Sequence, residues 1–343
     1  MAADAFEDFL TAARAQHGAE AEAWTEAAPA LHDELVVRWE LTLTEVLGED
    51  PTTYLVAGLR SGEVPVTLKI AYPDAWFVEE VAALLHWGGA GAAAVIDHDP
   101  RGAVLLERAE PATPLADEPD EEHALLVACG VAERLWIANP GGIAHLAGEV
   151  LEWARTMPGR HHLTNRPFER ILVHEAVSAI RELVPTQPEQ VLLHGDLHLG
   201  NIVLAGEDSW LAVAPKPLIG EHAFDAAALI YGGAERIARD RMGGKERLGR
   251  RLDVVSERLE IDRERLRRWA LAISTDYALW DFEAGIRDRG EARADVAEML
   301  RSLPPPTPPV EPEVEAVAEA GAEAVADPDV EAETTLAAEQ EPT

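Results

Sequence analysis

The chain has 343 residues, 47% of them hydrophobic, and a formal net charge of −34. This length and composition predict a globular protein of about two domains with a sizeable core. The negative charge argues against nucleic acid and anionic membranes as partners. The first residues are acidic where a signal peptide would be basic, and no apolar run approaches the ~20 residues of a membrane span. We therefore expect a cytoplasmic protein.

Residues 1–40 are expected to form an N-terminal helical segment. Apolar residues recur there on one helical face, at Phe6, Phe9, Leu10 and Ala13. Residues 41–110 change to short β-rich runs separated by turn signals at 48–51 and 61–63. They predict a small antiparallel lobe with one helix at 75–87 and strands at 41–47, 52–59, 64–70, 93–97 and 103–107.

Residues 111–302 predict a larger helical lobe, joined to the sheet by a linker near 109–119. Its long amphipathic stretches lie at 121–138, 143–157, 167–183, 223–239, 246–260 and 263–287. Short strand runs over 191–214 interrupt them. Cys129, the only cysteine, lies among apolar neighbours in the first stretch, which predicts a buried thiol and excludes a disulfide within the chain.

Residues 303–343 are mostly Pro, Ala, Glu and Val, with eleven acidic residues and no basic or aromatic ones. A segment of this composition buries too little apolar surface to offset its ordering entropy. We expect a disordered acidic tail.

The sequence HGDLHLGN at residues 194–201 follows an apolar strand run. It places Asp196 five residues before Asn201, which is the spacing of the catalytic loop in protein-kinase-like phosphotransferases. In such loops the aspartate accepts the proton of the substrate hydroxyl, and the asparagine binds a magnesium ion at the ATP phosphates. The pattern predicts Asp196 as the catalytic base and Asn201 as a metal ligand.

Two other interpretations of this stretch stay open. It could be a polar loop that caps a helix, or it could be a metal site, because His194, Asp196 and His198 alternate as ligands do on a strand. A metallohydrolase would need further histidines, for which His161, His162 and His222 are candidates. That interpretation gives no role to the spacing of the aspartate and asparagine.

The apolar strand run at 64–70 carries one lysine, Lys69, as expected of a lysine that reaches nucleotide phosphates. Taken alone, Lys69 is more simply an exposed strand-edge residue. The helix at 75–87 offers Glu79 and Glu80 as partners, about 100° apart around the helix. We choose Glu80 as the partner because its neighbours on the same face are apolar, and we expect Glu79 to be solvated.

The loop between the first two strands lacks the glycine-rich pattern that covers phosphates in protein kinases. Gly48 is present, and Thr52 and Thr53 could supply donors instead, although a simple turn is the alternative. At the lobe junction, residues 105–109 could present main-chain groups to adenine, and we include Glu107 among the nucleotide-binding residues.

Several segments resemble one family, the aminoglycoside/hydroxyurea phosphotransferases of the streptomycin 6-kinase group. They are HGDLHLGN at 194–201, WLAVAPKPLIG at 210–220, AFD at 223–225, the strand with Lys69, EVAAL at 80–84, LLER at 105–108, RWALA at 268–272 and LWD at 279–281. The resemblance spans roughly residues 40–285, and its Pro-Lys-Pro run is not shared by most kinase-like families.

The resemblance implies an α+β, bilobal protein-kinase-like fold, with ATP and Mg²⁺ as cofactors. It also implies phosphorylation of a hydroxyl on a small molecule, by default an aminoglycoside-like antibiotic. Asp225 matches a family aspartate that braces the catalytic loop, and we expect His194 to support the same loop. Asp276 and Asp281, near the end of the matched region, could face a cationic substrate, with a solvated helix face as the equal alternative.

The chain departs from the family pattern in two places. Aspartate normally precedes Pro-Lys-Pro as the second metal ligand, and this chain has Ala214 there. Asp276 and Tyr277 stand where the streptomycin-kinase pattern has Gln-Asn, which leaves the acceptor open. An alanine cannot bind magnesium, and losing such a ligand typically costs several kcal/mol of barrier, or roughly a thousand-fold in rate.

Ala214 leaves two hypotheses for function. The chain is a phosphotransferase impaired at its metal site, with Asn201 and water holding the metal, or it is a non-catalytic relative that binds a nucleotide or small molecule. The alanine could also have been introduced to disable the site.

Overall fold

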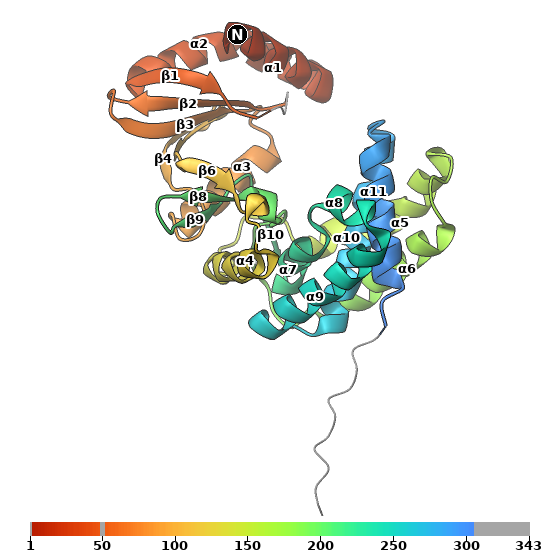
Figure 1. Ribbon diagram of the computed structural model, residues 1–343. Helices are drawn as coiled ribbons and strands as arrows, with labels where there is room; N and C mark the ends of the chain where they lie inside the picture. The colour runs from red at the N-terminus through yellow and green to blue at the C-terminus, as the bar shows by residue number, and fades with distance from the viewer. Residues whose placement is uncertain (1, 49–51, 305–343) are drawn as a thin grey trace, which may run out of the picture. The chain divides into compact units, whose positions relative to one another are not determined.

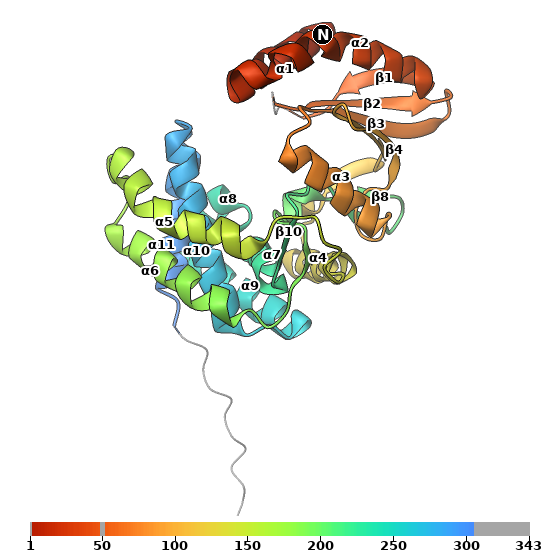
Figure 2. The ribbon, with the colours of Figure 1, turned by 180° about the vertical axis from the view of Figure 1, so that it is seen from behind.

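The computed structural model describes residues 2–48 and 52–304 of the chain. They form a β-sheet lobe followed by a helical lobe (Figures 1 and 2). The turn expected at 49–51 and the predicted acidic tail from residue 305 onward lie outside the described residues. In the two described ranges, no helix is both long and apolar enough to cross a membrane.

The sheet lobe is built on five antiparallel strands in the order β1-β2-β3-β5-β4. Their bounds are β1 Leu41–Val46, β2 Tyr54–Arg60, β3 Val64–Ile70, β4 Val95–Asp99 and β5 Ala103–Glu107. The five predicted strands are therefore confirmed, with ends shifted by a residue or two. One helix, α3 (Ala75–Trp87), is inserted between β3 and β4 as expected.

Two N-terminal helices cover one face of this sheet (Figure 1). They are α1 (Ala2–His17) and α2 (Glu22–Arg38), joined by the 3-10 turn η1 (Gly18–Ala21). The predicted apolar face of α1 is buried in the sheet, with Phe6 half-buried at its edge. The apolar face predicted within residues 1–40 is thus the surface by which these helices pack against the strands.

Alternation along β3 decides which side chains meet which helix. Val66, Leu68 and Ile70 are buried in the cluster that includes α1 and α2. Because successive strand side chains point to opposite faces, Lys69 points to the other face, where α3 packs through Phe77. The sheet thus separates the face that packs against α1 and α2 from the face that carries Lys69.

The predicted linker near 109–119 is partly ordered into the fold. β6 (Pro111–Pro114) pairs with β8 at the edge of a three-stranded sheet, and the 3-10 turn η2 (Leu115–Asp117) follows it. Two prolines lack the N–H that a central strand needs, which suits β6 to an edge position. The lobe junction is therefore tied to the strands that carry the motif.

The helical lobe contains eight helices and four short strands within the described ranges. The helices are α4 Glu121–Leu135, α5 Leu146–Leu163, α6 Arg170–Leu183, α7 His222–Tyr231, α8 Ala234–Arg239, α9 Arg241–Leu259, α10 Arg263–Glu283 and α11 Arg287–Arg301. The strands are β7 Val191–Leu193, β8 Ile202–Ala205, β9 Trp210–Ala212 and β10 Leu218–Gly220, with 3-10 turns η3 Val184–Thr186 and η4 Leu199–Asn201.

Two predicted helices are interrupted in the structure. The stretch expected at 223–239 breaks at Gly232 and Gly233, and the positive φ of Gly233 (75°) separates α7 from α8. The stretch expected at 263–287 ends at Glu283, and Gly285, also at positive φ (76°), leads into α11. In both places glycine adopts a left-handed conformation that ends the helix.

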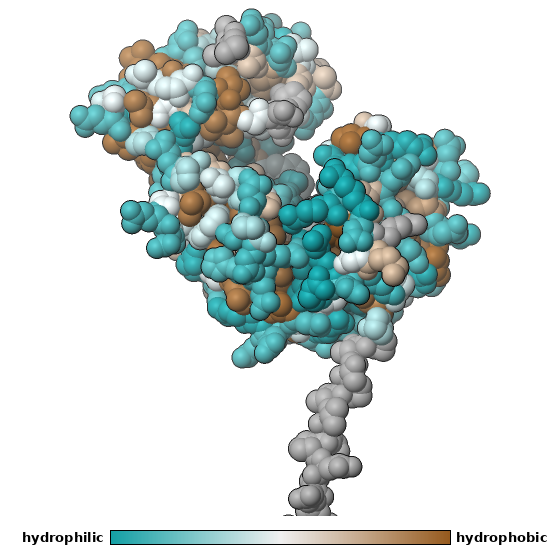
Figure 3. Space-filling model, viewed as in Figure 1, coloured by the Kyte–Doolittle hydropathy of each residue, from teal (hydrophilic) through white to brown (hydrophobic). Residues whose placement is uncertain are grey.

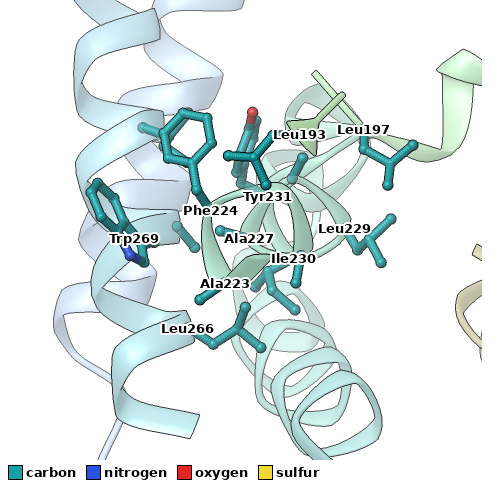
Figure 4. Close-up of a cluster of buried hydrophobic side chains, with 14 of the residues drawn as sticks. Leu193, Leu197, Ala223, Phe224, Ala227, Leu229, Ile230, Tyr231, Leu266 and Trp269 are labelled. Carbon is teal, nitrogen blue, oxygen red and sulfur yellow. The ribbon is translucent and has the colours of Figure 1, made fainter. Parts of the chain in front are cut away.

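The core of the helical lobe surrounds α7. All residues of α7 after His222 are buried, as expected for a helix that is apolar on every side. Figure 4 shows Phe224 beside Trp269 of α10, with Leu193, which precedes the motif, and Leu197, which belongs to it, to the right of the Phe224 ring. The Phe224 and Trp269 rings meet edge to face, 5.4 Å between centroids. The motif loop is thus anchored in the main core.

The predicted burial of Cys129 is confirmed. Burial raises the pKa of its thiol to about 12, so it is an inert packing residue. The face of the molecule shown in Figure 3 is largely hydrophilic over the helical lobe, and its apolar side chains are scattered.

Candidate active site

The HGDLHLGN loop lies between two antiparallel ladders. β7 pairs with β10 before the loop, and β8 pairs with β9 after it. Residues 213–217, which connect β9 to β10, therefore run alongside the loop. The Lys216 N–H donates to the His194 carbonyl at 2.8 Å, and the Val213 N–H donates to the Asn201 carbonyl at 2.8 Å.

Gly195 allows these two segments to approach closely. Its φ is 80°, and a Cβ at this position would lie 1.8 Å from the Lys216 carbonyl oxygen. No side chain can be accommodated at that distance. The loop and the Pro-Lys-Pro run are thus held in one arrangement.

Asp225 of α7 fixes the start of the loop. Its carboxylate accepts the N–H groups of His194 and Gly195, both at 2.7 Å, and the Trp136 indole N–H at 3.1 Å. Burial raises the pKa of Asp225 to about 6, although the three donors act in the opposite direction. The predicted bracing contact is present.

His194 is fully buried and uses both ring nitrogens inside the loop. Its Nδ1 accepts the Asp196 N–H at 3.3 Å, and its Nε2 faces the Val213 carbonyl at 3.1 Å. Burial lowers the pKa of His194 to about 4, so the ring is neutral and its proton is assigned to Nε2. A ring in this arrangement has no lone pair free for a metal.

Asp196 is largely buried, and its Oδ2 lies 2.9 Å from the Lys216 ammonium. Burial alone would raise the pKa of Asp196. Lys216, His198 and His194 outweigh that effect and lower the pKa below its usual range. The side chain is therefore a carboxylate at neutral pH, as a proton acceptor must be.

Asn201 is oriented by the loop itself. Its Nδ2 donates to the Asp196 carbonyl oxygen at 2.8 Å. This bond turns the amide so that Oδ1 is the atom left to bind a cation. The structure thus links the predicted base and the predicted metal ligand through one hydrogen bond.

Ala214 has a left-handed backbone, with φ at 55°. Alanine is uncommon in this conformation, whereas aspartate and asparagine are several-fold enriched there. The residue is exposed toward a cavity, and hydrogen bonds of Val213 and Lys216 to the loop hold the backbone on both sides of it. The backbone at this position keeps the shape that favours a short acidic side chain.

Lys69 and Glu80 form the predicted ion pair. The Lys69 ammonium lies 2.6 Å and 2.5 Å from the two carboxylate oxygens of Glu80. Glu80 is buried on the face of α3 that carries Phe77, and Glu79 is half-buried on a different face. The choice of Glu80 over Glu79 as the partner is confirmed.

This pair lines a cavity of about 510 Å³, which we call the sheet-side cavity. Its wall continues through Thr52 and Thr53, the two threonines of the expected first loop, to Ala214 and Lys216. The volume is in the range of ordinary ligand sites.

A second cavity of about 480 Å³, the helix-side cavity, lies on the other side of Lys216. Its lining includes acidic and aromatic side chains, namely Glu149, Trp153, Asp196, Tyr231, Glu235, Asp276, Tyr277 and Trp280, together with Lys216 and Arg293. Asp196 therefore faces the helix-side cavity, next to the lysine that borders both.

Asp276 reaches the helix-side cavity, but it is not solvated. It is buried, and its Oδ1 lies 2.6 Å from Arg160 of α5, which also binds Glu283. Burial raises the pKa of Asp276 to about 6, with Arg160 acting in the opposite direction.

Asp281 is not brought to either cavity, which corrects the expectation that it faces substrate or water. It is fully buried, and it accepts from Arg289 at 2.7 Å and Arg293 at 2.7 Å. Both arginines come from α11, a helix that follows the last stretch predicted from the sequence, 263–287. Asp281 therefore ties α10 to α11.

Glu107 ends β5 at the lobe junction and is used internally. Its Oε1 accepts the Ala94 N–H at 2.9 Å, and its own N–H donates to the Ala94 carbonyl at 2.9 Å. These bonds brace the entry to β4.

The alternative metal site is not assembled in the described ranges, where no group of three or more His, Cys, Asp or Glu side chains could hold a metal. His161 contacts the Phe168 carbonyl, and His222 pairs with Glu189. His161 belongs to α5 and His222 to α7, and these partners engage both rings.

Sequence reasoning gave no role to Lys216, although it noticed the Pro-Lys-Pro run. Nor did it single out Trp76, Glu149 or Arg293, which the cavities now bring forward. The position of Lys216 between two prolines was the sequence feature that could have indicated a role for it. The others come from separate helices, so no local pattern marks them.

A family model described as aminoglycoside/hydroxyurea antibiotic resistance kinase matches residues 38–285. The chain belongs to this family. It is 33% identical over 290 residues to the streptomycin 6-kinase of Streptomyces glaucescens, covering 83% of this chain and 92% of that protein. It is 31% identical over 290 residues to the hydroxyurea phosphotransferase of Kitasatospora aureofaciens, covering 82% of each.

The kinase-like fold is confirmed by a solved structure. A thermostable mutant of aminoglycoside phosphotransferase APH(4)-Ia, in a ternary complex with AMP-PNP and hygromycin B, superposes with a TM-score of 0.55 at 16% identity. The match covers 79% of this chain and 98% of the other. The α+β bilobal architecture of this antibiotic resistance kinase family member thus agrees with expectation.

The sheet-side cavity fits a nucleoside triphosphate, because Lys69 and Lys216 both line it and can bind negatively charged phosphate oxygens. The same wall fits magnesium poorly. Asn201, whose amide could supply one neutral oxygen, is not among the residues that line this cavity, and Ala214 supplies no ligand atom. A Mg²⁺ ion would be held mainly by phosphates and water, which it tolerates better than most cations do.

Proposed function

We propose that this protein is an ATP-dependent phosphotransferase that acts on a hydroxyl of a small, antibiotic-like molecule, and that Ala214 slows it. One observation carries the proposal. Asp196 is a buried carboxylate in the helix-side cavity, and its partner Lys216 borders the cavity that holds Lys69. A base and two phosphate-binding cations thus meet where the two cavities adjoin.

In this proposal, ATP occupies the sheet-side cavity. Lys69, oriented by Glu80, contacts the α- and β-phosphates. The solved relative that holds AMP-PNP supports a nucleotide in this fold. Mg²⁺ would add charge neutralisation at the phosphates, with Asn201 as its protein ligand.

The acceptor occupies the helix-side cavity, with its hydroxyl at Asp196. As the acceptor oxygen bonds to the γ-phosphorus, its proton passes to a carboxylate oxygen of Asp196. The bond from the γ-phosphorus to the bridging oxygen breaks, and that electron pair leaves with ADP. Lys216 stands between the two groups, where it can stabilise charge on the transferred phosphoryl.

The cavity lining supports a polar, cationic acceptor. Four carboxylates line it, from Glu149, Asp196, Glu235 and Asp276, against the two cations Lys216 and Arg293. The relatives named for streptomycin and hydroxyurea provide the two acceptors to try first.

The test is ADP release with each acceptor in the presence of ATP and Mg²⁺. Asp196→Asn should lower kcat by about 10²- to 10⁴-fold, the usual contribution of a general base. Asp208→Asn is the matched control, because Asp208 is an exposed aspartate in the turn after β8. Equal activity in Asp196→Asn and the unaltered protein would overturn the assignment of the base.

A non-catalytic binding protein is the second candidate, and the methyl group at Ala214 is the observation that favours it. Calorimetry of ATP with and without Mg²⁺ separates the two. ATP binding that needs no Mg²⁺, combined with no turnover of either acceptor, supports the binding protein. Turnover that requires Asp196 supports the kinase.

A further inference from the structure

Two of the tryptophans are much more exposed to solvent than the others. The chain has nine tryptophans, all within the described residues. Seven are buried or half-buried, namely Trp24, Trp39, Trp87, Trp136, Trp153, Trp210 and Trp269. The other two, Trp76 and Trp280, are 50% and 55% exposed.

Both exposed tryptophans border both cavities. Trp76 lies in the first turn of α3, in the sheet lobe, and Trp280 lies near the end of α10, in the helical lobe. Only one other described residue lines both cavities, and that is Lys216 beside the catalytic base. The two indoles therefore flank the place where phosphoryl transfer is proposed, one from each lobe.

Packing does not account for these positions. Within residues 2–48 and 52–304, neither indole donates a hydrogen bond or meets another aromatic ring, and Trp280 has Arg289 6.0 Å from its centroid. Leaving half of an indole in water sacrifices stabilisation that the other seven gain by burial. Exposed aromatic groups at the rim of a cavity are typical of ligand contacts.

The charge of the two cavities indicates which ligand they contact. The sheet-side cavity is balanced, with Lys69 and Lys216 against Asp74 and Glu80. The helix-side cavity has an excess of carboxylates over cations. Tryptophan attracts cations through its ring face more strongly than other aromatic residues do. A cationic ring compound matches both features.

Resting on the phosphotransferase function proposed above, we propose that Trp76 and Trp280 form an aromatic clamp that contacts a cationic, ring-bearing acceptor from the two lobes. The clamp determines acceptor specificity. A ring with cationic substituents can meet the faces of both indoles, whereas hydroxyurea has neither a ring nor a cationic group.

The kinetic test uses Trp76→Ala and Trp280→Ala in the full chain. Each should raise the KM for streptomycin about ten-fold, the size of one cation–π contact that is partly desolvated. The KM for ATP and the KM for hydroxyurea should rise less than the KM for streptomycin, and Trp→Phe at each position should restore part of the loss. Trp210→Phe is the control, because Trp210 packs in β9 away from both cavities.

Two kinetic outcomes overturn the clamp. One is a rise in the KM for ATP in place of the acceptor, which would mean that the indoles stack on adenine. The other is no change in the KM for streptomycin in either alanine variant. Misfolding of a variant is detected by the circular dichroism spectrum and does not count toward either outcome.

A binding measurement separates the clamp from the phosphotransferase proposal. Streptomycin, without ATP, should protect tryptophan fluorescence from acrylamide quenching, and the protection should vanish in the double variant Trp76→Ala/Trp280→Ala. Protection without any turnover would retain the clamp and overturn the phosphotransferase. Turnover without protection would retain the phosphotransferase and overturn the clamp.

Discussion

Charged side chains line both cavities, but they find their partners in different ways. In the sheet-side cavity, Lys69 and Glu80 are eleven positions apart and meet across one strand–helix connection. In the helix-side cavity, Asp276 meets Arg160, 116 positions away, and nearby Asp281 is enclosed by two arginines of α11. Two arginines of the neighbouring helix thus close Asp281 off from both cavities, whereas Asp276 keeps its place in the cavity lining beside Arg160.

The cavities also differ in how closely their residues agree with the family. The sheet-side cavity contains the ion pair and the strand that the family pattern leads one to expect, yet it lacks the acid at Ala214. The helix-side cavity keeps the catalytic loop but has Asp276 and Tyr277 in place of the family pair. We infer that the first difference affects rate and the second affects choice of acceptor.

The largest expected effect comes from adding the missing acid. Ala214→Asp should raise kcat with ATP and Mg²⁺ by about a thousand-fold, because a carboxylate there binds metal where transition-state charge develops. The left-handed backbone already suits aspartate, so the fold should not change. Ala214→Asn is the matched control, with the same backbone preference and no charge. If the two variants have equal kcat, the metal-site account of Ala214 is wrong.

Variants of Asp281 and Asp276 distinguish an acidic residue that stabilises the fold from one that lines the helix-side cavity. Asp281→Ala should lower the free energy of unfolding by about 3 kcal/mol, because it leaves Arg289 and Arg293 without their buried partner. Urea denaturation measures the loss. Asp276→Asn, in contrast, should change the KM for the acceptor and cost less stability. A higher acceptor KM in Asp281→Ala at unchanged stability would return Asp281 to the binding site.

Lys69 tests the sheet-side cavity by itself. Lys69→Met should lower kcat/KM for ATP about a hundred-fold, since it removes a phosphate contact and leaves Glu80 buried and unpaired. Glu80→Gln should have a smaller effect in the same direction, because the lysine remains but loses its orientation. Steady-state kinetics at varied ATP give both values. An unchanged acceptor KM in both variants would confirm that the cavities are separate.

The smallest effect concerns pH. Lys216 is one of the charges that lower the pKa of Asp196, so Lys216→Gln should raise that pKa. A carboxylate of lowered pKa stays ionised as the pH falls, and activity should then persist into acid. In Lys216→Gln the acid limb of the kcat/KM profile should move to higher pH. A limb that moves to lower pH, or does not move, would show that Lys216 does not control Asp196.

The sequence alone determined the parts of the site that local periodicity and spacing encode. The single lysine of an apolar strand run indicated Lys69, and the apolar neighbours on one helical face selected Glu80. The spacing of Asp196 and Asn201 predicted the HGDLHLGN loop, and the family pattern predicted that Asp225 holds that loop in place. Each of these statements needs one element or two neighbouring ones, so a short stretch of chain contains the information.

Only the tertiary structure decided the rest. It showed Ala214 in a left-handed backbone, it enclosed Asp281 between arginines of α11, and it set Trp76 and Trp280 at the border of two cavities. These features depend on which distant segments pack together and on which charge reaches a carboxylate first. A linear pattern holds the chemistry of each side chain, but the environment that gives it a role comes from segments that only the folded chain brings together.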